Sequence, residues 1–246
     1  MTFIIGHRGA RNLWAENSLT GFRNLLDLNV EGVEFDVHLT NDGELLVMHD
    51  ALLDRTAEAQ GPVSELPAGA HRQIRLKNSS DTIPTLDEVL EVYAGTKLEL
   101  HVELKKDVNG QAYKGLEELA AAAIDKFGLA DRAYLTSFSV DVLKTIRATA
   151  PHIRTLNSYH MPDAEAEGVV EGLKARLAAA DIVAIEKHLL DTHWDEITAN
   201  SPLSRLGAWV PNERDDLEKW MNCGLRQITT DNPDTALTVR GSGTTL

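Results

Sequence analysis

The sequence predicts an α/β fold, specifically a closed (β/α)8 barrel of the TIM type. Short apolar segments alternate with amphipathic ones along the whole chain, which is typical of a parallel sheet flanked by helices. Eight such apolar segments can be counted, and a helical pattern follows each of them. The alternative is an open doubly wound sheet. No Gly-x-Gly-x-x-Gly turn follows a predicted strand, so nothing in the sequence indicates the dinucleotide site of such a sheet.

The expected elements follow one another in regular order. Apolar residues recur at helical spacing within 16–28, directly after the first strand. Thr85 is the expected N-cap of a helix over 85–93, and residues 113–127 form an alanine-rich helix. The eight predicted strands span 2–6, 32–37, 98–104, 132–136, 153–157, 182–186, 206–210 and 226–230.

Residues 50–83 interrupt the alternation after the second strand. They contain Gly61-Pro62 and a polar run over 78–81. A structureless loop of that length is unusual within a compact domain, so we expect a small inserted subdomain on the catalytic face. Residues 1–240 are then expected to form one domain that includes this insertion, and the Gly/Ser/Thr-rich residues 241–246 a flexible tail.

Composition narrows the class of protein. A formal charge of −14 argues against a nucleic-acid partner, because phosphate backbones bind basic surfaces. The single cysteine, Cys223, excludes an intrachain disulfide framework. Neither a signal peptide nor an integral membrane segment is recognisable, so we expect a cytoplasmic protein that acts on a small molecule. The sequence leaves open whether it forms a homo-oligomer.

Three carboxylates are candidate metal ligands. Glu34 and Asp36 lie two positions apart on a predicted strand, so their side chains share a face and can converge on one cation. Glu103 ends the next strand, and the carboxyl ends of barrel strands meet at one mouth. Carboxylate oxygens suit Mg²⁺ or Ca²⁺, whereas zinc is a poorer fit without a cysteine cluster or a His-Glu-x-x-His motif. The alternative for Glu34 and Asp36 is a salt-bridged strand pair.

Two histidines, His7 and His49, accompany these acids. Together these residues indicate a phosphate-processing metal site, where a base would activate the attacking oxygen and an acid would protonate the leaving one, and the two histidines are the candidates. The sequence does not tell which is the acid. Arg8 and Lys105 are expected to bind the phosphoryl oxygens and stabilise the transition state.

Other residues near these motifs have more than one interpretation. Glu16 and Asn17 are expected to begin the first helix, with Asn17 as its N-cap, or else to support the metal site. A salt bridge to Glu16 is the alternative for Arg8. His38 and His101 are expected to support the site or to pack in the core. The remaining histidines have no such neighbours and are expected to have no role in the site: His71, His152, His160, His188 and His193.

A series of short motifs recurs in order along the chain: His7-Arg8-Gly9, Glu16-Asn17-Ser18, Glu34-Phe35-Asp36, Thr40-Asn41-Asp42-Gly43, His49-Asp50, Leu53-Asp54-Arg55-Thr56, Ile83-Pro84-Thr85-Leu86, Glu103-Leu104-Lys105, Ser137-Phe138 and Thr230-Asp231-Asn232-Pro233. The order and spacing of these motifs resemble the glycerophosphodiester phosphodiesterases over essentially the whole chain. The resemblance implies cleavage to glycerol 3-phosphate and an alcohol such as choline or ethanolamine, and it places Trp209 beside the glycerol pocket, with packing under a helix as the alternative. Trp209-Val210-Pro211-Asn212 departs from the usual Trp-Thr-Val-Asn and leaves the alcohol open.

Two further expectations concern the reaction. No Ser, Cys or Thr stands in a recognisable nucleophile motif, so water or the substrate itself attacks. We expect the glycerol 2-hydroxyl to attack and form a cyclic glycerol phosphate that water then opens. The alternatives are a lysophospholipase D-like or phospholipase-like enzyme of the same fold, and a non-catalytic barrel that binds a phosphate ligand.

Overall fold

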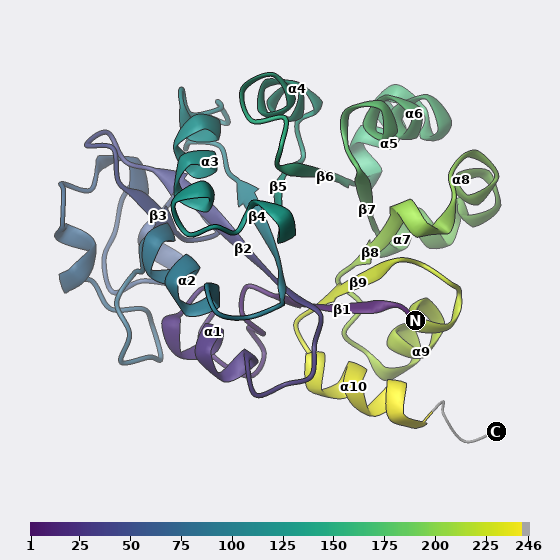
Figure 1. Cartoon of the computed structure of the whole chain (residues 1–246), viewed down its shortest axis with the longest axis horizontal. Coiled ribbons are helices and arrows are strands. Elements are labelled where there is room, and N and C mark those ends of the chain that lie inside the picture. Colours follow the sequence, from purple (N-terminus) through teal and green to yellow (C-terminus); the bar gives the residue numbers. More distant parts are fainter. Residues whose placement is uncertain (243–246) are drawn as a thin grey trace.

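The computed structural model describes residues 1–242, which form a closed barrel of eight parallel strands surrounded by helices (Figure 1). The barrel closes because β1 pairs with both β2 and β9. All eight predicted strands are present, with boundaries within two residues of those expected, so the predicted fold class is confirmed. The strands are β1 (Phe3–His7), β2 (Gly32–Leu39), β4 (Glu99–Leu104), β5 (Ala133–Ser137), β6 (Arg154–Tyr159), β7 (Ile182–Glu186), β8 (Leu206–Trp209) and β9 (Gln227–Thr230).

Strand register places the acidic residues level with one another. His7 pairs with Glu34 across β1 and β2, and Asp36 pairs with Glu103 across β2 and β4. All residues of β2 except its last are buried, as expected for a parallel strand covered on both faces. The apolar residues among them pack under the helices. The alternate residues, Glu34 and Asp36, face the barrel mouth.

The helices follow the predicted alternation. Thr85 forms a capping box with Glu88, which confirms the expected start of the second helix. The helices are α1 (Leu19–Leu25), α2 (Leu86–Tyr93), α3 (Leu116–Lys126), α4 (Val140–Thr149), α5 (Met161–Glu167), α6 (Val169–Ala179), α7 (Lys187–Thr192), α8 (Trp194–Asn200), α9 (Arg214–Asn222) and α10 (Pro233–Ser242).

The predicted N-cap of α1 is wrong. Ser18, not Asn17, is in the extended conformation of a cap and accepts a hydrogen bond from the Gly21 backbone N–H. Asn17 instead has a left-handed backbone with φ of 56°. In this conformation the Asn17 side chain turns inward and donates a hydrogen bond to Asp36.

Residues 50–83 form the protruding segment beside β3 in Figure 1. They contain three short 3₁₀ helices, Leu53–Arg55, Val63–Glu65 and Ala70–Gln73. Sequence patterns did not predict β3 (Leu45–Val47), which pairs antiparallel to β2 and leads the chain into the insertion. An apolar cluster separate from the barrel core stabilises the insertion and comprises Leu46, Met48, Leu53, Ala57, Val63, Leu76 and Ile83.

An ion pair crosses the barrel at the amino-terminal ends of its strands, opposite the mouth that holds Glu34 and Asp36. Arg226, directly before β9, donates from Nη2 to both carboxylate oxygens of Glu99, at 2.7 and 2.8 Å. Glu99 is the first residue of β4, so this pair crosses the barrel floor. Burial opposes ionisation of Glu99, but the interactions with His101 and Arg226 outweigh it and lower the Glu99 pKa to about 2.

The carboxyl-terminal end of the chain departs from the expectation. The predicted tail began at residue 241, but Gly241 and Ser242 form the end of α10. Residues 243–246 lie outside the described part of the chain. Among residues 1–242, no helix combines the length and the apolar character that crossing a bilayer requires.

Candidate active site

The three predicted metal ligands come together at the carboxyl ends of β2 and β4. Glu34, Asp36 and Glu103 each present a carboxylate oxygen, and these oxygens lie within 4.8 Å of one another. Lys105 Nζ lies 2.7 Å from Glu103 Oε1 and 3.3 Å from Asp36 Oδ1. Arg8 donates its backbone N–H to Glu34 Oε2 at 3.2 Å, and its side-chain Nε lies 3.5 Å from Asp36 Oδ2. The two predicted phosphate-binding cations therefore lie against the acidic cluster.

Burial makes this cluster electrostatically demanding. Burial, together with the charges of Asp36 and Glu103, raises the pKa of Glu34 well above its ordinary value. Burial also opposes ionisation of Asp36, but Lys105, His49 and Arg8 outweigh it and hold the Asp36 pKa low. Lys105, His49 and Arg8 thus favour the charged form of Asp36, whereas the pKa of its neighbour Glu34 stays raised. A divalent cation would supply the missing positive charge.

The donor set fits a hard cation. It consists of carboxylate oxygens without sulfur, the ligand type that Mg²⁺ and Ca²⁺ prefer. Asn17 Nδ2 donates to Asp36 Oδ2 at 2.9 Å, and the amide oxygen of the same buried side chain has no hydrogen-bond partner. An unsatisfied buried oxygen beside three carboxylates is a further neutral donor for a cation. Asn17 therefore lies beside the three carboxylates, and its expected support of a metal site stays a prediction.

His7 is held by a carboxylate from the other end of the chain. Its Nδ1 lies 2.5 Å from Asp231 Oδ1, and Asp231 also accepts from Arg11 Nε at 2.8 Å and from Asn212 Nδ2 at 2.7 Å. With Nδ1–H donating to Asp231, His7 Nε2 carries the free lone pair, 3.7 Å from Glu34 Oε2. Burial lowers the His7 pKa despite Asp231, so the neutral base is the favoured form.

His49 is held in a similar way from its own side of the mouth. Its Nδ1 lies 2.6 Å from Asp50 Oδ1. Arg55 clamps the pair by donating to Asp50 Oδ2 at 2.6 Å and to both oxygens of Glu16 at 2.8 Å. Glu16 also accepts a hydrogen bond from Arg8 Nη1 at 3.3 Å and therefore links the two arginines. It is not one of the three clustered carboxylates. The Arg8–Glu16 salt bridge that was the alternative for Arg8 is thus present, and the phosphate-binding role of Arg8 stays a prediction.

His38 contacts the backbone of His49. His38 Nε2 lies 3.2 Å from the His49 carbonyl oxygen, and Nδ1 lies 2.8 Å from the Tyr113 hydroxyl. A carbonyl only accepts, so Nε2–H is the donor and Nδ1 accepts from Tyr113. Burial lowers the His38 pKa to about 4, consistent with this neutral tautomer. His101 is buried deeper in the barrel, against the Tyr134 ring.

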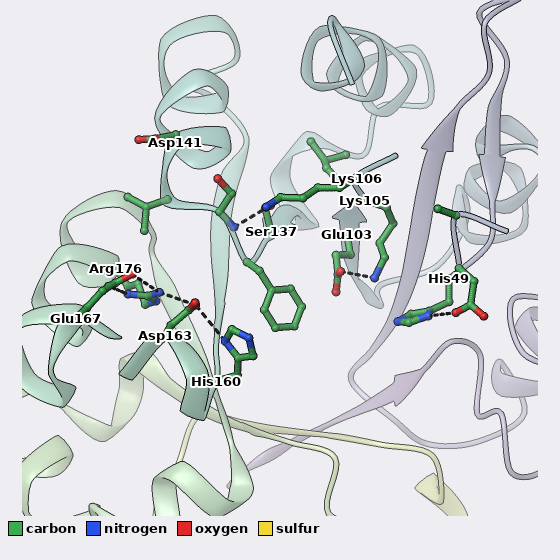
Figure 2. A pocket seen from close by; sticks show the side chains of 16 residues that line it. His49, Glu103, Lys105, Lys106, Ser137, Asp141, His160, Asp163, Glu167 and Arg176 are labelled. Atoms are coloured by element: carbon green, nitrogen blue, oxygen red, sulfur yellow. Dashed lines mark hydrogen bonds and ion pairs between the residues drawn. The ribbon is translucent and has the colours of Figure 1, made fainter. Parts of the chain in front are cut away.

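Two cavities meet at the carboxylates. The inner one, of about 180 Å³, is bordered by His7, Arg8, Glu34 and Trp209 among others. The outer one, of about 820 Å³, extends over the ends of β4, β5 and β6 toward α5 (Figure 2). Three residues border both cavities: His49, Glu103 and Phe138. A molecule that occupied both cavities would therefore pass beside Glu103, one of the three clustered carboxylates.

Sequence reasoning missed several contributors to this site, among them Asp231, Phe138 and His160. Asp231 and Phe138 stand within matched motifs, but no pattern assigned them a role. Phe138 packs edge-on against Trp209, with ring centroids 5.8 Å apart. His160 was expected to have no role, yet it lines the outer cavity. The only available signal was its position just after the sixth strand.

Comparison with known proteins gives a consistent result. The sequence model of the glycerophosphoryl diester phosphodiesterase family matches residues 7–235. A glycerophosphodiester phosphodiesterase of Caldanaerobacter subterraneus is 27% identical over 98% of this chain and 99% of its own. One of Bacillus altitudinis is 30% identical over 98% of each chain.

Solved structures share the fold. A putative glycerophosphoryl diester phosphodiesterase of Agrobacterium tumefaciens superposes with a TM-score of 0.89 at 22% identity and covers 99% of this chain and 98% of its own. An Oleispira antarctica phosphodiesterase, solved in complex with the product sn-glycerol-3-phosphate, superposes with a TM-score of 0.77 at 24% identity over 98% of this chain and 97% of its own.

Proposed function

The chain belongs to the glycerophosphoryl diester phosphodiesterase family, and from this premise we propose that it hydrolyses glycerophosphodiesters to glycerol 3-phosphate and an alcohol in a cation-dependent reaction. The observation that carries the proposal is the convergence of Glu34, Asp36 and Glu103 between two carboxylate-held histidines. The glycerol 3-phosphate product bound by the Oleispira antarctica relative supports the same substrate class.

The cation would be Mg²⁺ or Ca²⁺ held by these three carboxylates, and it would neutralise charge on the phosphodiester and polarise the phosphorus. Arg8 and Lys105 add fixed positive charge around the same point. Carboxylates already hold the side chains of Arg8 and Lys105 in place, so the charge that develops in the transition state would meet a prearranged environment.

We assign His7 as the base and His49 as the acid. His7 borders the inner cavity only, and its Nε2 lone pair is free. It can accept the proton of the glycerol 2-hydroxyl, which then attacks phosphorus to form a cyclic glycerol phosphate that water opens to glycerol 3-phosphate. His49 borders both cavities, so it faces the bond between phosphorus and the departing alcohol and can protonate that oxygen. Trp209 borders the glycerol part of the inner cavity.

A lipid-directed activity has less support. An exposed apolar rim on the insertion, able to bind an acyl chain, would favour such an activity. Of the three leucines that could form one, Leu53 is buried and Leu66 packs against the apolar cluster of the insertion. Only Leu52 is exposed.

The test is release of glycerol 3-phosphate from a panel of glycerophosphodiesters, with and without chelator. We expect release that is lost on chelation and restored by Mg²⁺ or Ca²⁺. Binding of the diesters without turnover under all of these conditions would instead indicate a non-catalytic barrel.

A further inference from the structure

The outer cavity has a polar wall that the proposed reaction does not use. On the side of the cavity away from His49, His160, Asp163, Glu167 and Arg176 form a connected group (Figure 2). His160 directly follows β6, Asp163 and Glu167 lie on α5, and Arg176 comes from α6. Glu103, one of the three clustered carboxylates, lines the same cavity.

This group is rigid because a buried arginine holds it. Arg176 is only 2% exposed and donates to Asp163 Oδ2 at 2.7 Å and to Glu167 Oε2 at 2.6 Å. Its guanidinium also stacks over the Tyr159 ring, 4.1 Å from the centroid. A guanidinium with these partners fixes the position of both carboxylates.

Asp163 in turn lies beside His160. Asp163 Oδ2, the oxygen bound by Arg176, lies 3.1 Å from His160 Nδ1, which is an ion-pair distance without the geometry of a hydrogen bond. A carboxylate so close favours a proton rather than a lone pair on Nδ1. The His160 ring also meets Phe138 edge-on, with centroids 5.3 Å apart and an interplanar angle of 77°. With Nδ1 turned to the carboxylate, Nε2 is the nitrogen left for a ligand in the cavity.

We propose that the outer cavity binds the leaving alcohol, that His160 Nε2 accepts a hydrogen bond from one of its hydroxyl groups, and that the preferred alcohol is therefore a polyol. The proposal rests on the proposed function, in which His49 separates the glycerol side from the leaving side. It names the leaving-group class, which the motifs of the sequence left open.

Among the residues that the structure describes, the outer cavity offers no unpaired carboxylate to a cationic alcohol such as choline or ethanolamine. Recognition of an ammonium group would favour an unpaired carboxylate or an aromatic cage. Lys105 borders the cavity but is itself paired with Glu103 and Asp36, whereas Lys106 adds a positive charge that repels a cation. All five carboxylates that line it already take part in ion pairs: Asp50, Glu103, Asp141, Asp163 and Glu167.

A hydrocarbon chain fits the cavity no better. Its wall contains only four apolar side chains, Ala51, Leu104, Phe138 and Val140, among polar and charged ones. A polyol requires neither an unpaired charge nor an apolar wall. It requires fixed hydrogen-bonding groups in a space larger than a small alcohol fills, which this wall provides.

The test compares four esters of glycerol 3-phosphate, those of glycerol, ethanolamine, choline and methanol. All four release glycerol 3-phosphate, so one assay measures kcat/KM for each. For the wild type we expect kcat/KM for the glycerol ester to exceed that for the methyl ester. In His160→Ala this ratio should fall about tenfold, the loss of roughly one hydrogen bond. Comparing the ratio between variants cancels the intrinsic reactivity of each ester.

Conservative variants separate binding from structural support. The Gln amide can reach the position of Nε2, whereas the Asn amide reaches only that of Nδ1. His160→Gln should therefore restore most of the ratio, and His160→Asn should behave like His160→Ala. The matched control is His193→Ala, because His193 Nδ1 also lies 3.1 Å from an i+3 carboxylate and its side chain has the same 32% exposure. It should leave the ratio unchanged.

Each other outcome is decisive. Cleavage of all four esters with a ratio that His160→Ala does not alter would overturn this inference and leave the proposed function standing. A wild-type preference for the ethanolamine or choline ester would overturn the polyol class. If no ester releases glycerol 3-phosphate in the presence of Mg²⁺ or Ca²⁺, the proposed function fails, and this inference with it.

Discussion

His7 Nδ1 and Asp231 Oδ1 lie 2.5 Å apart although 224 positions separate these residues in the chain. His7 is the last residue of β1, and Asp231 directly follows β9. These two strands pair to close the barrel, so the contact forms only when the barrel is complete. The pairing of β1 with β9 therefore both closes the barrel and brings Asp231 to the proposed base.

Asp231→Asn should lower kcat on the order of a hundredfold or more, because the amide no longer favours the tautomer that leaves His7 Nε2 unprotonated. KM should change little, since Asp231 is completely buried and does not reach the substrate. Steady-state kinetics measure both values. Asp234→Asn, a change of an exposed carboxylate three residues later, should be neutral. Wild-type turnover in Asp231→Asn would show that Asp231 does not contribute to catalysis.

Glu103→Gln should weaken cation binding and turnover together, because the side chain keeps its shape but loses a charged ligand. Mg²⁺ or Ca²⁺ at a hundred times Kd should raise the free energy of unfolding of the metal-stripped wild type by about 2.7 kcal/mol. The melting temperature should rise accordingly. The variant should show a smaller rise at the same concentration. Full activity of the metal-stripped wild type would contradict the proposed cation requirement.

His7→Ala and His49→Ala should each reduce turnover of an ordinary diester on the order of a hundredfold or more. A nitrophenyl leaving group needs little protonation, so a nitrophenyl ester of glycerol phosphate should rescue His49→Ala and not His7→Ala. Stopped-flow release of nitrophenolate measures the difference. Rescue of His7→Ala instead would reverse the assignment of acid and base.

A 2-deoxy analogue of the glycerophosphodiester should bind with similar affinity but turn over orders of magnitude more slowly. It lacks the internal hydroxyl whose proximity lowers the entropy cost of attack. Phosphorus NMR of the normal reaction should also show a transient cyclic glycerol phosphate. A normal rate for the deoxy compound would indicate direct attack by water and leave the cation and histidine proposals intact.

Glu99→Gln should destabilise the protein at pH 7 by about 3 kcal/mol, since it removes an acid whose pKa lies at about 2 in the fold against an ordinary 4.5. A lowered carboxyl pKa stabilises the fold above pH 4.5, and the contribution disappears as the pH falls toward 2. At pH 3 the difference between wild type and variant should shrink to about 1 kcal/mol. Urea unfolding at both pH values measures it. A difference that does not change with pH would show that the Glu99–Arg226 pair does not depend on the Glu99 charge.

The sequence by itself determined the barrel and the acidic centre of the candidate site. Both are recorded in short-range patterns: the alternation of strands and helices, and the i, i+2 spacing of Glu34 and Asp36 on one strand. Because parallel strands present their carboxyl ends at one mouth, Glu103 could be placed beside them before any distance was known.

Only the tertiary structure decided which residues support that centre. Asn17 turns toward Asp36 because its backbone is left-handed, and its contacts across the barrel mouth favour this conformation over the local preference for a cap. Asp231 reaches His7, and Arg176 fixes Asp163 beside His160, through contacts between separate elements. Such contacts depend on barrel closure and on helix packing against neighbouring strands. No periodicity within a single segment encodes these arrangements.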